Sequence, residues 1–174
     1  RIVNWDPTLA TTISDDEIDH KEVQSTMYYL QYGPFVIATS RPETKLGDTG
    51  IAVHPDDERH QSYIGQTIEV EWPKGQKIKV KVFADSKVDQ EFGTGVVGVT
   101  PAHSQVDFAM AQDHDLEIRQ VIGEDGNMLE SVSGYGGMTV LECRDAFVKE
   151  LEDAGLMGKK EPYLQALSLC YRSK

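Results

Sequence analysis

Two short segments hold most of the side chains that could do chemistry in this chain. Residues 39–48 read TSRPETKLGD, and residues 93–107 read GTGVVGVTPAHSQVD. Each continues an apolar run of strand character into hydroxyls, a turn-forming proline or glycine, and charged groups. Loops that follow strands present functional groups from a rigid support, so the two segments predict a site that recognises a small polar molecule.

The first segment is rich in hydroxyl groups. Thr39, Ser40 and Thr44 can line a polar pocket or orient a water, because each hydroxyl donates and accepts hydrogen bonds. The alternative is that they make only local hydrogen bonds at the strand end and in the turn. Arg41 is a candidate ligand contact, with a surface ion pair to Glu43 as the alternative. Asp48 follows a Leu-Gly turn and is equally suited to orienting the loop.

The second segment ends in a carboxylate that has two possible roles. Asp107 could hold an ammonium group by a charge-assisted hydrogen bond. It also stands three residues after Ser104, the spacing of a capping box at a helix start, which needs no ligand. Thr100 and His103 flank Pro101-Ala102. His103 is a candidate to position a water or sugar hydroxyls, but a lone histidine is more often a structural hydrogen-bonding group, and no Ser-His-Asp arrangement is evident.

Composition limits what the chain can be. Its 174 residues suffice for one domain with a sizeable core, and no apolar run reaches the ~18 residues of a membrane helix, so no membrane partner is expected. The two cysteines form neither a disulfide framework nor a zinc set, which favours a reducing, cytoplasmic setting. The chain starts at Arg1 with no methionine, which suggests a piece of a longer protein.

The net charge of −12 argues against a free-standing nucleic-acid binder. If RNA is a partner, this domain is expected to meet only an end of it, with other parts of the parent chain supplying most of the affinity.

Periodicity predicts many short strands and few helices. Turns at Gly33-Pro34 and at residues 73–76 predict hairpins, and residues 56–61 could form one or two helical turns. Strands are expected at residues 27–32, 35–39, 51–54, 68–72, 78–83, 95–100 and 118–122.

Two helix starts stand out. Ser104 is a predicted N-cap for a helix to residue 115, and Thr139 with Glu142 caps the clearest helix, which ends at Gly155. Residues 1–25 are polar and are expected to be an irregular connecting segment. The fold class expected is α+β: a curled mixed β-sheet or small β-barrel with two or three flanking helices.

Several motifs occur in the order found in one family. The two segments above, HPDDER at residues 54–59 and VTPAH at residues 99–103 are accompanied by VNWDP at residues 3–7, EPY at residues 161–163 and CYR at residues 170–172. The chain closely resembles the editing domain inserted into class I aminoacyl-tRNA synthetases of the valine, isoleucine and leucine group, and most of all its valine branch.

This resemblance implies a division of the chain and an activity. Residues 26–158 would be the editing domain, with residues 1–25 and 159–174 connecting it to the synthetase core. The activity implied is hydrolysis of the ester that joins a wrong amino acid, threonine, to the 3′ end of tRNA(Val). Such a second site is needed because an apolar synthetic pocket cannot strongly reject an isostere that adds a hydroxyl.

The resemblance also implies roles for single residues. Asp107 would bind the α-ammonium, acting with Thr39, Ser40 and Thr44 as the catalytic set. Arg41 would face the terminal adenosine or its phosphate. The remaining candidate substrate contacts are Glu43, Asp48, Thr100, His103 and Ser104. An aminoacyl ester is labile, so a positioned water suffices, and we expect no metal, no cofactor and no covalent intermediate.

Three positions depart from the family pattern. The valine branch usually has lysine at Gly98 and aspartate at Ser104, and the family usually has threonine at Ser40. The joint loss of a lysine and an aspartate is consistent with a compensated pair, and it leaves the amino-acid selectivity open. Two other functions stay open: a module that binds the tRNA 3′ end without hydrolysis, and editing of the leucine or isoleucine type.

Overall fold

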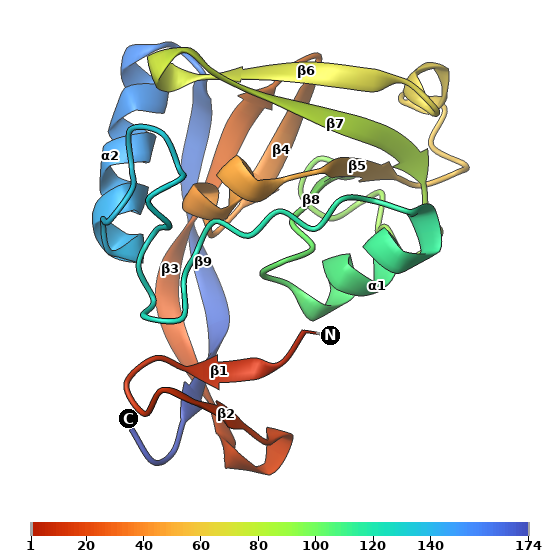
Figure 1. Cartoon of the computed structure of the whole chain (residues 1–174). Helices are drawn as coiled ribbons and strands as arrows, with labels where there is room; N and C mark the ends of the chain where they lie inside the picture. The colour runs from red at the N-terminus through yellow and green to blue at the C-terminus, as the bar shows by residue number, and fades with distance from the viewer. Residues whose placement is uncertain (1, 174) are drawn as a thin grey trace.

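A computed structural model describes residues 2–173 of the chain. Its main body is built from two β-sheets with α2 (Val140–Asp153) along one side and α1 (Gln105–His114) at the opposite lower edge (Figure 1). A small third sheet, formed by β1 (Asn4–Asp6) and β2 (Thr11–Ile13), lies below the main body in Figure 1 and contacts it through Trp5, which donates to the Glu124 carbonyl. The predicted α+β class is confirmed. Within the described residues the sheets do not close into a barrel.

One sheet has the strand order β4-β3-β9 and is antiparallel throughout. The predicted hairpin at Gly33-Pro34 joins β3 (Ile18–Tyr32) to β4 (Phe35–Thr39), so β4 is an edge strand. The other neighbour of β3 is β9 (Met157–Cys170), which pairs with it from Ile18 opposite Cys170 to Leu30 opposite Met157.

The second sheet has the order β6-β7-β5-β8. Strand β7 forms because Ile78, Val80 and Val82 alternate with exposed lysines, so one face of the strand enters the core. The edge strand β8 pairs antiparallel with β5, whereas β5 and β7 are parallel. The four strands of this second sheet are β5 (Gly50–Val53), β6 (Thr67–Trp72), β7 (Gln76–Ala84) and β8 (Val96–Val99).

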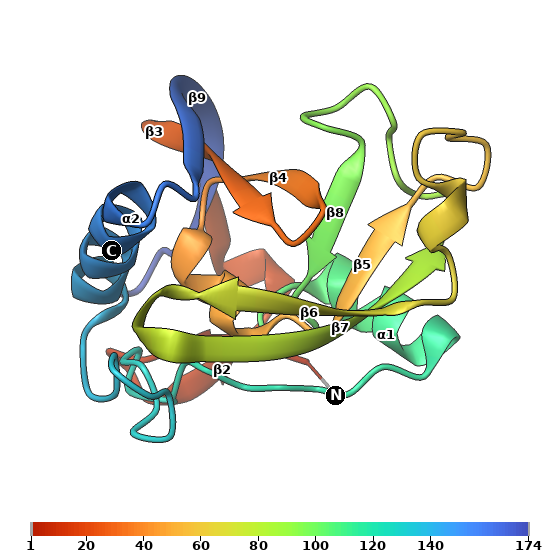
Figure 2. The same cartoon turned by 90° about the horizontal axis from the view of Figure 1, so that it is seen from above.

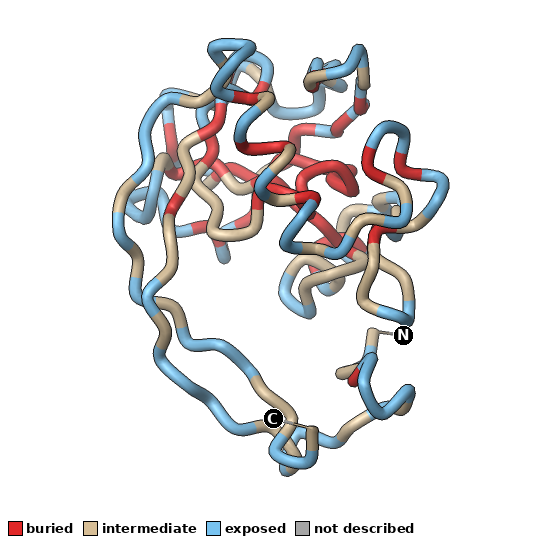
Figure 3. The backbone as a smooth tube through the Cα atoms, turned by 90° about the vertical axis from the view of Figure 1, so that its left-hand side faces the viewer, coloured by how far each residue is buried: buried red, intermediate tan, exposed pale blue. Residues whose placement is uncertain are grey.

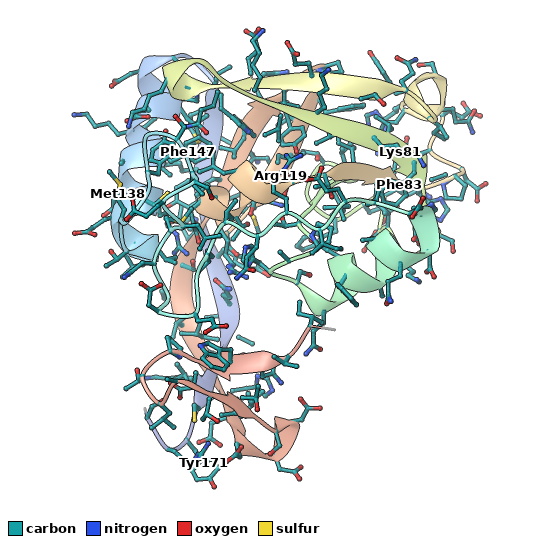
Figure 4. The ribbon with its side chains drawn as sticks, in the orientation of Figure 1. Lys81, Phe83, Arg119, Met138, Phe147 and Tyr171 are labelled. Atoms are coloured by element: carbon teal, nitrogen blue, oxygen red, sulfur yellow. The ribbon has the colours of Figure 1, made fainter. Side chains whose placement is uncertain are left out.

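An aromatic chain links the two sheets to α2. Tyr32 and Trp72 meet edge to face with centroids 5.3 Å apart, and Trp72 meets Phe147 at the same separation. Tyr135 completes the contact on the other side of Phe147, at 5.7 Å. Figure 4 shows Phe147 between α2 and the sheets. Burial of these rings holds the helix on the sheets and fixes Tyr32 beneath the site described below.

The ends of the chain form a long two-stranded ribbon. Residues 18–25 of β3 pair with the end of β9, so the prediction of an irregular segment over residues 1–25 is wrong. The partner strand supplies the backbone hydrogen bonds that a polar sequence alone does not reveal. Figure 3 shows the buried positions gathered in the main body and this ribbon largely exposed. The division at residues 25 and 158 stays a prediction, and residues 1 and 174 lie outside the described part.

Two further predictions need correction. Residues 118–122 form no strand: the amides of Val121 and Ile122 donate to the His103 ring, and Ile122 makes only an isolated bridge to Met128. Residues 56–61 form successive turns, and a short 3-10 helix (Gln61–Tyr63) follows. Among residues 2–173, no helix is both long and apolar enough to cross a membrane.

Candidate active site

The site forms where two edge strands from different sheets lie side by side. β4 and β8 contact each other without pairing, and Figure 2 shows them next to each other at the open side of the body. A 3-10 helix (Pro42–Gly47) follows β4, and α1 follows β8 after a short turn. The Arg41 guanidinium bridges the two segments by donating from Nη1 to the His103 carbonyl at 3.2 Å.

The Asp107 carboxylate is held from the end of β8. Its Oδ2 accepts a hydrogen bond from the Thr100 amide at 2.8 Å. Ser104 caps α1 as predicted, with its Oγ accepting from the Asp107 amide at 3.2 Å. The carboxylate therefore points at Thr100 instead of completing the capping box. Asp107 is half-buried, and no hydrogen bond within residues 2–173 occupies its Oδ1.

The hydroxyls of the first segment divide into two groups. Thr39 and Ser40 are half-buried, and Thr39 Oγ1 accepts from the Arg41 amide at 3.1 Å, which leaves its proton free to donate. Thr44 is buried, and its hydroxyl donates to the Arg41 carbonyl at 2.8 Å. Thr39 and Ser40 are therefore accessible to a ligand, whereas Thr44 stabilises the turn.

Arg41 lies between two carboxylates. Its side chain is 42% exposed, and its Nε lies 4.0 Å from Glu43 Oε1. Partial burial lowers the pKa of Arg41, and the negative charges of Glu43 and Asp107 oppose that shift. The guanidinium thus remains a partly exposed cation that can meet a phosphate or a polar ligand group.

Glu43 lies inside the protein and not at the surface. Its side chain is fully buried, and Arg144 on α2 donates to both carboxylate oxygens at 2.8 Å. The alternative of a surface ion pair between Arg41 and Glu43 does not apply, because Glu43 is buried and joins the 3-10 helix to α2. Arg144 lies 101 positions along the chain, and no local pattern in the sequence indicates this pairing.

A buried polar cluster lies beneath the site. Lys45 Nζ donates to Asp48 Oδ1 at 3.1 Å, the Gly98 carbonyl at 2.7 Å and Thr100 Oγ1 at 2.9 Å. Asp48 also accepts from the Tyr32 hydroxyl at 2.8 Å and from Thr100 Oγ1. Desolvation raises the pKa of Asp48, and the Lys45 ammonium opposes this. Asp48 and Thr100 are thus hydrogen-bonded to each other and buried from solvent.

His103 supports the loop that the sequence analysis expected to be a strand. Its Nε2 accepts from the amides of Val121 and Ile122, at 3.0 and 3.3 Å. Both donors require an unprotonated Nε2, and burial next to Arg41 accordingly lowers the pKa of His103 to about 4. This ring nitrogen is occupied, which fits the structural alternative. The His103 carbonyl in turn accepts from Arg41 Nη1.

A groove of about 930 Å³ adjoins the site. Arg41 and His103 contribute to its wall, and Trp5 closes it from the N-terminal segment by donating from Nε1 to the Glu124 carbonyl at 2.7 Å. Its apolar lining includes Pro101, Ala102, Phe108, Ile118 and Ile122. The sequence analysis did not identify this groove, because its walls come from five separate stretches of the chain.

Phe92 is a further residue that the sequence analysis missed. Its side chain is 57% exposed in the loop before β8. The next residue, Gly93, lies so close to β4 that an added Cβ would be 3.1 Å from Ala38 Cβ. An exposed aromatic ring therefore lies in a loop packed against the strand that leads to Thr39. No local pattern in the sequence indicates that this ring is exposed beside the site.

Comparison with known proteins assigns the family. A family model described as the leucyl-tRNA synthetase editing domain matches residues 56–141. The valine–tRNA ligase of Bacillus thuringiensis subsp. konkukian (strain 97-27) is 44% identical over 178 residues, covering 99% of this chain and 20% of that protein. The Thermotoga maritima and Chlamydia pneumoniae valine–tRNA ligases are 42% and 40% identical, over 98% and 99% of the chain.

The chain spans about a fifth of the length of these relatives. The shared region includes both segments that meet between β4 and β8. With this identity across almost its whole length, the chain belongs to the aminoacyl-tRNA synthetase editing-domain family and is most similar to the valine branch of that family.

Proposed function

We propose that this chain hydrolyses the ester that joins threonine to the 3′-terminal adenosine of mischarged tRNA(Val). The observation that carries the proposal is Asp107, which the Thr100 amide holds by one oxygen while the other has no hydrogen bond within residues 2–173. A fixed carboxylate with a free oxygen suits the α-ammonium of an aminoacyl ester. The likeness to valine–tRNA ligases favours threonine as the amino acid.

The reaction needs only a positioned water. The water oxygen attacks the ester carbonyl carbon, and the bond from that carbon to the ribose oxygen breaks. The ribose oxygen takes up a proton, and threonine leaves with the hydroxyl of the water. Thr39 and Ser40 are the accessible hydroxyls that can orient the water or donate to the developing oxyanion. Neither a metal, a cofactor nor a covalent intermediate is part of this proposal.

Selectivity for threonine follows from its hydroxyl group. A polar pocket that hydrogen-bonds this hydroxyl leaves a buried group unpaired when valine binds, which costs roughly 1–3 kcal/mol. That cost corresponds to about a 5- to 150-fold preference for threonine. The valine branch usually has aspartate at the position of Ser104. In this chain the hydroxyls of Ser104 and Ser40 are therefore the proposed partners of the threonine side chain.

The proposed partners are the 3′ end of an aminoacylated tRNA and the rest of a cytoplasmic synthetase. The exposed Phe92 ring, in the loop whose Gly93 approaches β4, provides a surface on which the terminal base can stack. Arg41 offers a cation to the terminal nucleotide. The groove beside Arg41 and Trp5 offers room for the nucleotides that precede it. The net charge of −12 makes other parts of the synthetase the source of most tRNA affinity.

The proposal is tested with the full-length synthetase that contains this chain. Threonyl-tRNA(Val) and valyl-tRNA(Val) are incubated with the enzyme, and the loss of each ester is followed over time. We expect the threonyl ester to be hydrolysed faster than the valyl ester. Binding of both without hydrolysis would identify a non-catalytic 3′-end module. A preference for mischarged leucine or isoleucine tRNA would identify one of the other editing types.

A further inference from the structure

A lysine and an aspartate lie together inside the protein beneath the site. The side chains of Lys45 and Asp48 are 8% and 0% exposed, and their charged atoms are 3.1 Å apart. Burial of an ion pair costs free energy unless further hydrogen bonds satisfy both groups. Here Lys45 donates to three acceptors, and Asp48 accepts from Tyr32 and Thr100 as well as from Lys45. The pair is therefore fully satisfied and fixed in one arrangement.

Gly98 makes room for this pair. An added Cβ at position 98 would overlap Asp48 Oδ2 and would lie 3.4 Å from Lys45 Nζ. The Lys45 ammonium also donates to the Gly98 carbonyl at 2.7 Å. A side chain at position 98 and the observed Lys45–Asp48 pair are thus mutually exclusive in this geometry. The lysine usual in the valine branch at position 98 is absent, and an ammonium reaches the same space from position 45.

The cluster connects to the proposed substrate-binding carboxylate through one residue. Thr100 receives a hydrogen bond from Lys45 at its hydroxyl and donates to Asp107 Oδ2 from its amide. Thr100 is only 2% exposed, so these contacts define its position. Any shift of Thr100 moves the amide that orients Asp107. The buried ammonium therefore acts on the site through the end of β8, without touching the ligand.

We propose that Lys45 is a positioning residue for the editing site, and that Lys45 and Gly98 form a reciprocal pair in which one ammonium beside β8 fixes Thr100 and thereby Asp107. This inference rests on the proposed function. It adds a residue to which the family resemblance assigned no role, and it identifies the compensation for the missing lysine at position 98. In this proposal an ammonium can reach the same space from the 3-10 helix at position 45 or from β8 at position 98.

The test uses four forms of the full-length synthetase: wild type, Lys45→Met, Gly98→Lys, and the double variant. Deacylation of threonyl-tRNA(Val) and valyl-tRNA(Val) is measured for each. Thermal unfolding reports the stability of each form, and aminoacylation of tRNA(Val), which we expect to be unchanged, shows whether the rest of the synthetase is intact. Lys45→Met/Asp48→Asn serves as the matched control, because it removes both buried charges together.

We expect each single variant to lose about tenfold or more in threonyl-tRNA hydrolysis, the effect of losing a hydrogen bond to a charged group. The ratio of threonyl to valyl rates should fall with it. The double variant should recover most of the wild-type rate and ratio. Recovery in the double variant also supports the pair if either single variant unfolds. The control Lys45→Met/Asp48→Asn should unfold near the wild-type temperature and keep the reduced ratio of threonyl to valyl hydrolysis rates.

The inference would be overturned if Lys45→Met hydrolysed both esters at wild-type rates. It would also be overturned if the double variant were no better than the worse single variant, both in rate and in unfolding temperature. Loss of thermal stability with an unchanged rate ratio would likewise reduce Lys45 to a structural role. Failure of the wild type to hydrolyse threonyl-tRNA(Val) would instead contradict the proposed function. In that case the unfolding temperatures alone still test whether positions 45 and 98 are coupled.

Discussion

At the scale of single residues, the carboxylates around β4 and β8 have different surroundings. Both oxygens of Glu43 are engaged by Arg144, and Asp48 is surrounded by Lys45, Tyr32 and Thr100. Asp107 is instead half-buried and uses one oxygen on the Thr100 amide. It is therefore the carboxylate of this group that combines a fixed orientation with an oxygen left for a ligand.

Thr39 and Thr44 offer a matched pair of substitutions. Thr39→Val removes the accessible hydroxyl, so threonyl-tRNA(Val) hydrolysis should fall by about tenfold, as expected for one lost hydrogen bond. Thr44→Val removes a buried hydrogen bond to the Arg41 carbonyl, which should cost ~1 kcal/mol of unfolding free energy. Its effect on hydrolysis should be smaller. Kinetic assays and urea unfolding measure the two effects, and the opposite ranking of rates would contradict the division.

His103 gives a pH dependence of stability. Its pKa is lowered from 6.5 to about 4, so between these values the unfolded chain binds the proton more readily than the folded chain. The stability from this group is complete above pH 6.5 and declines as the pH falls toward 4. His103→Gln retains an acceptor without a titrating group, so its melting temperature should drop less than that of wild type between pH 7 and 4.5. Equal drops in both proteins would contradict this assignment.

Sequence patterns could name candidate residues for the site, but most of the contacts of those residues were not predictable. Ser104 was predictable as an N-cap because its partner, the Asp107 amide, is three residues away. The partners of Lys45 at Gly98 and Thr100 are more than fifty positions distant. Such contacts depend on how two sheets pack, and a local pattern contains no information about that.

At the scale of elements, a buried ion pair joins the loop after β4 to α2. Arg144→Met should leave the Glu43 carboxylate buried without its partner and cost about 3–5 kcal/mol of unfolding free energy. The double variant Glu43→Gln/Arg144→Met should recover part of that loss, because the uncompensated charge is gone. Chemical unfolding of the three proteins tests this. Equal stability of Arg144→Met and wild type would show that the pair does not hold the loop.

The elements were predictable where their signals are local. Thr139 and Glu142 form the expected capping box at the start of α2, with the Thr139 amide donating to Glu142 at 2.9 Å. Hairpin turns and alternating strands were predictable for the same reason. Residues 118–122 have strand-forming composition, yet His103 supplies their hydrogen-bond acceptor. Residues 18–25 are polar, yet β9 pairs with them.

At the scale of the whole molecule, the net charge and the position of the site favour a domain whose substrate is bound mainly by other parts of a longer protein. The body carries its site at an open edge, and the exposed β3–β9 ribbon leads away from it (Figure 3). The net charge of −12 repels a polyanion. The chain also spans only a fifth of the length of its valine–tRNA ligase relatives.

The net charge of −12 predicts that the domain depends on the rest of the synthetase for tRNA binding. The isolated chain should require at least about tenfold more threonyl-tRNA(Val) for half-maximal hydrolysis than the full-length synthetase, since it lacks compensating phosphate contacts. Raising the salt concentration should weaken the full-length enzyme more than the isolated chain. Steady-state kinetics at two salt concentrations provide the comparison. Equal KM values for the two proteins would show that the domain binds tRNA by itself.

The most direct test of the account is the rate at which Asp107→Asn hydrolyses threonyl-tRNA(Val) in the full-length synthetase. Asparagine can still accept from the Thr100 amide, so the fold should persist while the negative charge is lost. Loss of a charge-assisted hydrogen bond predicts a fall of about 10- to 100-fold in kcat/KM. The preference over valyl-tRNA(Val) should also weaken. A folded Asp107→Asn enzyme with the wild-type rate and preference would contradict the central claim.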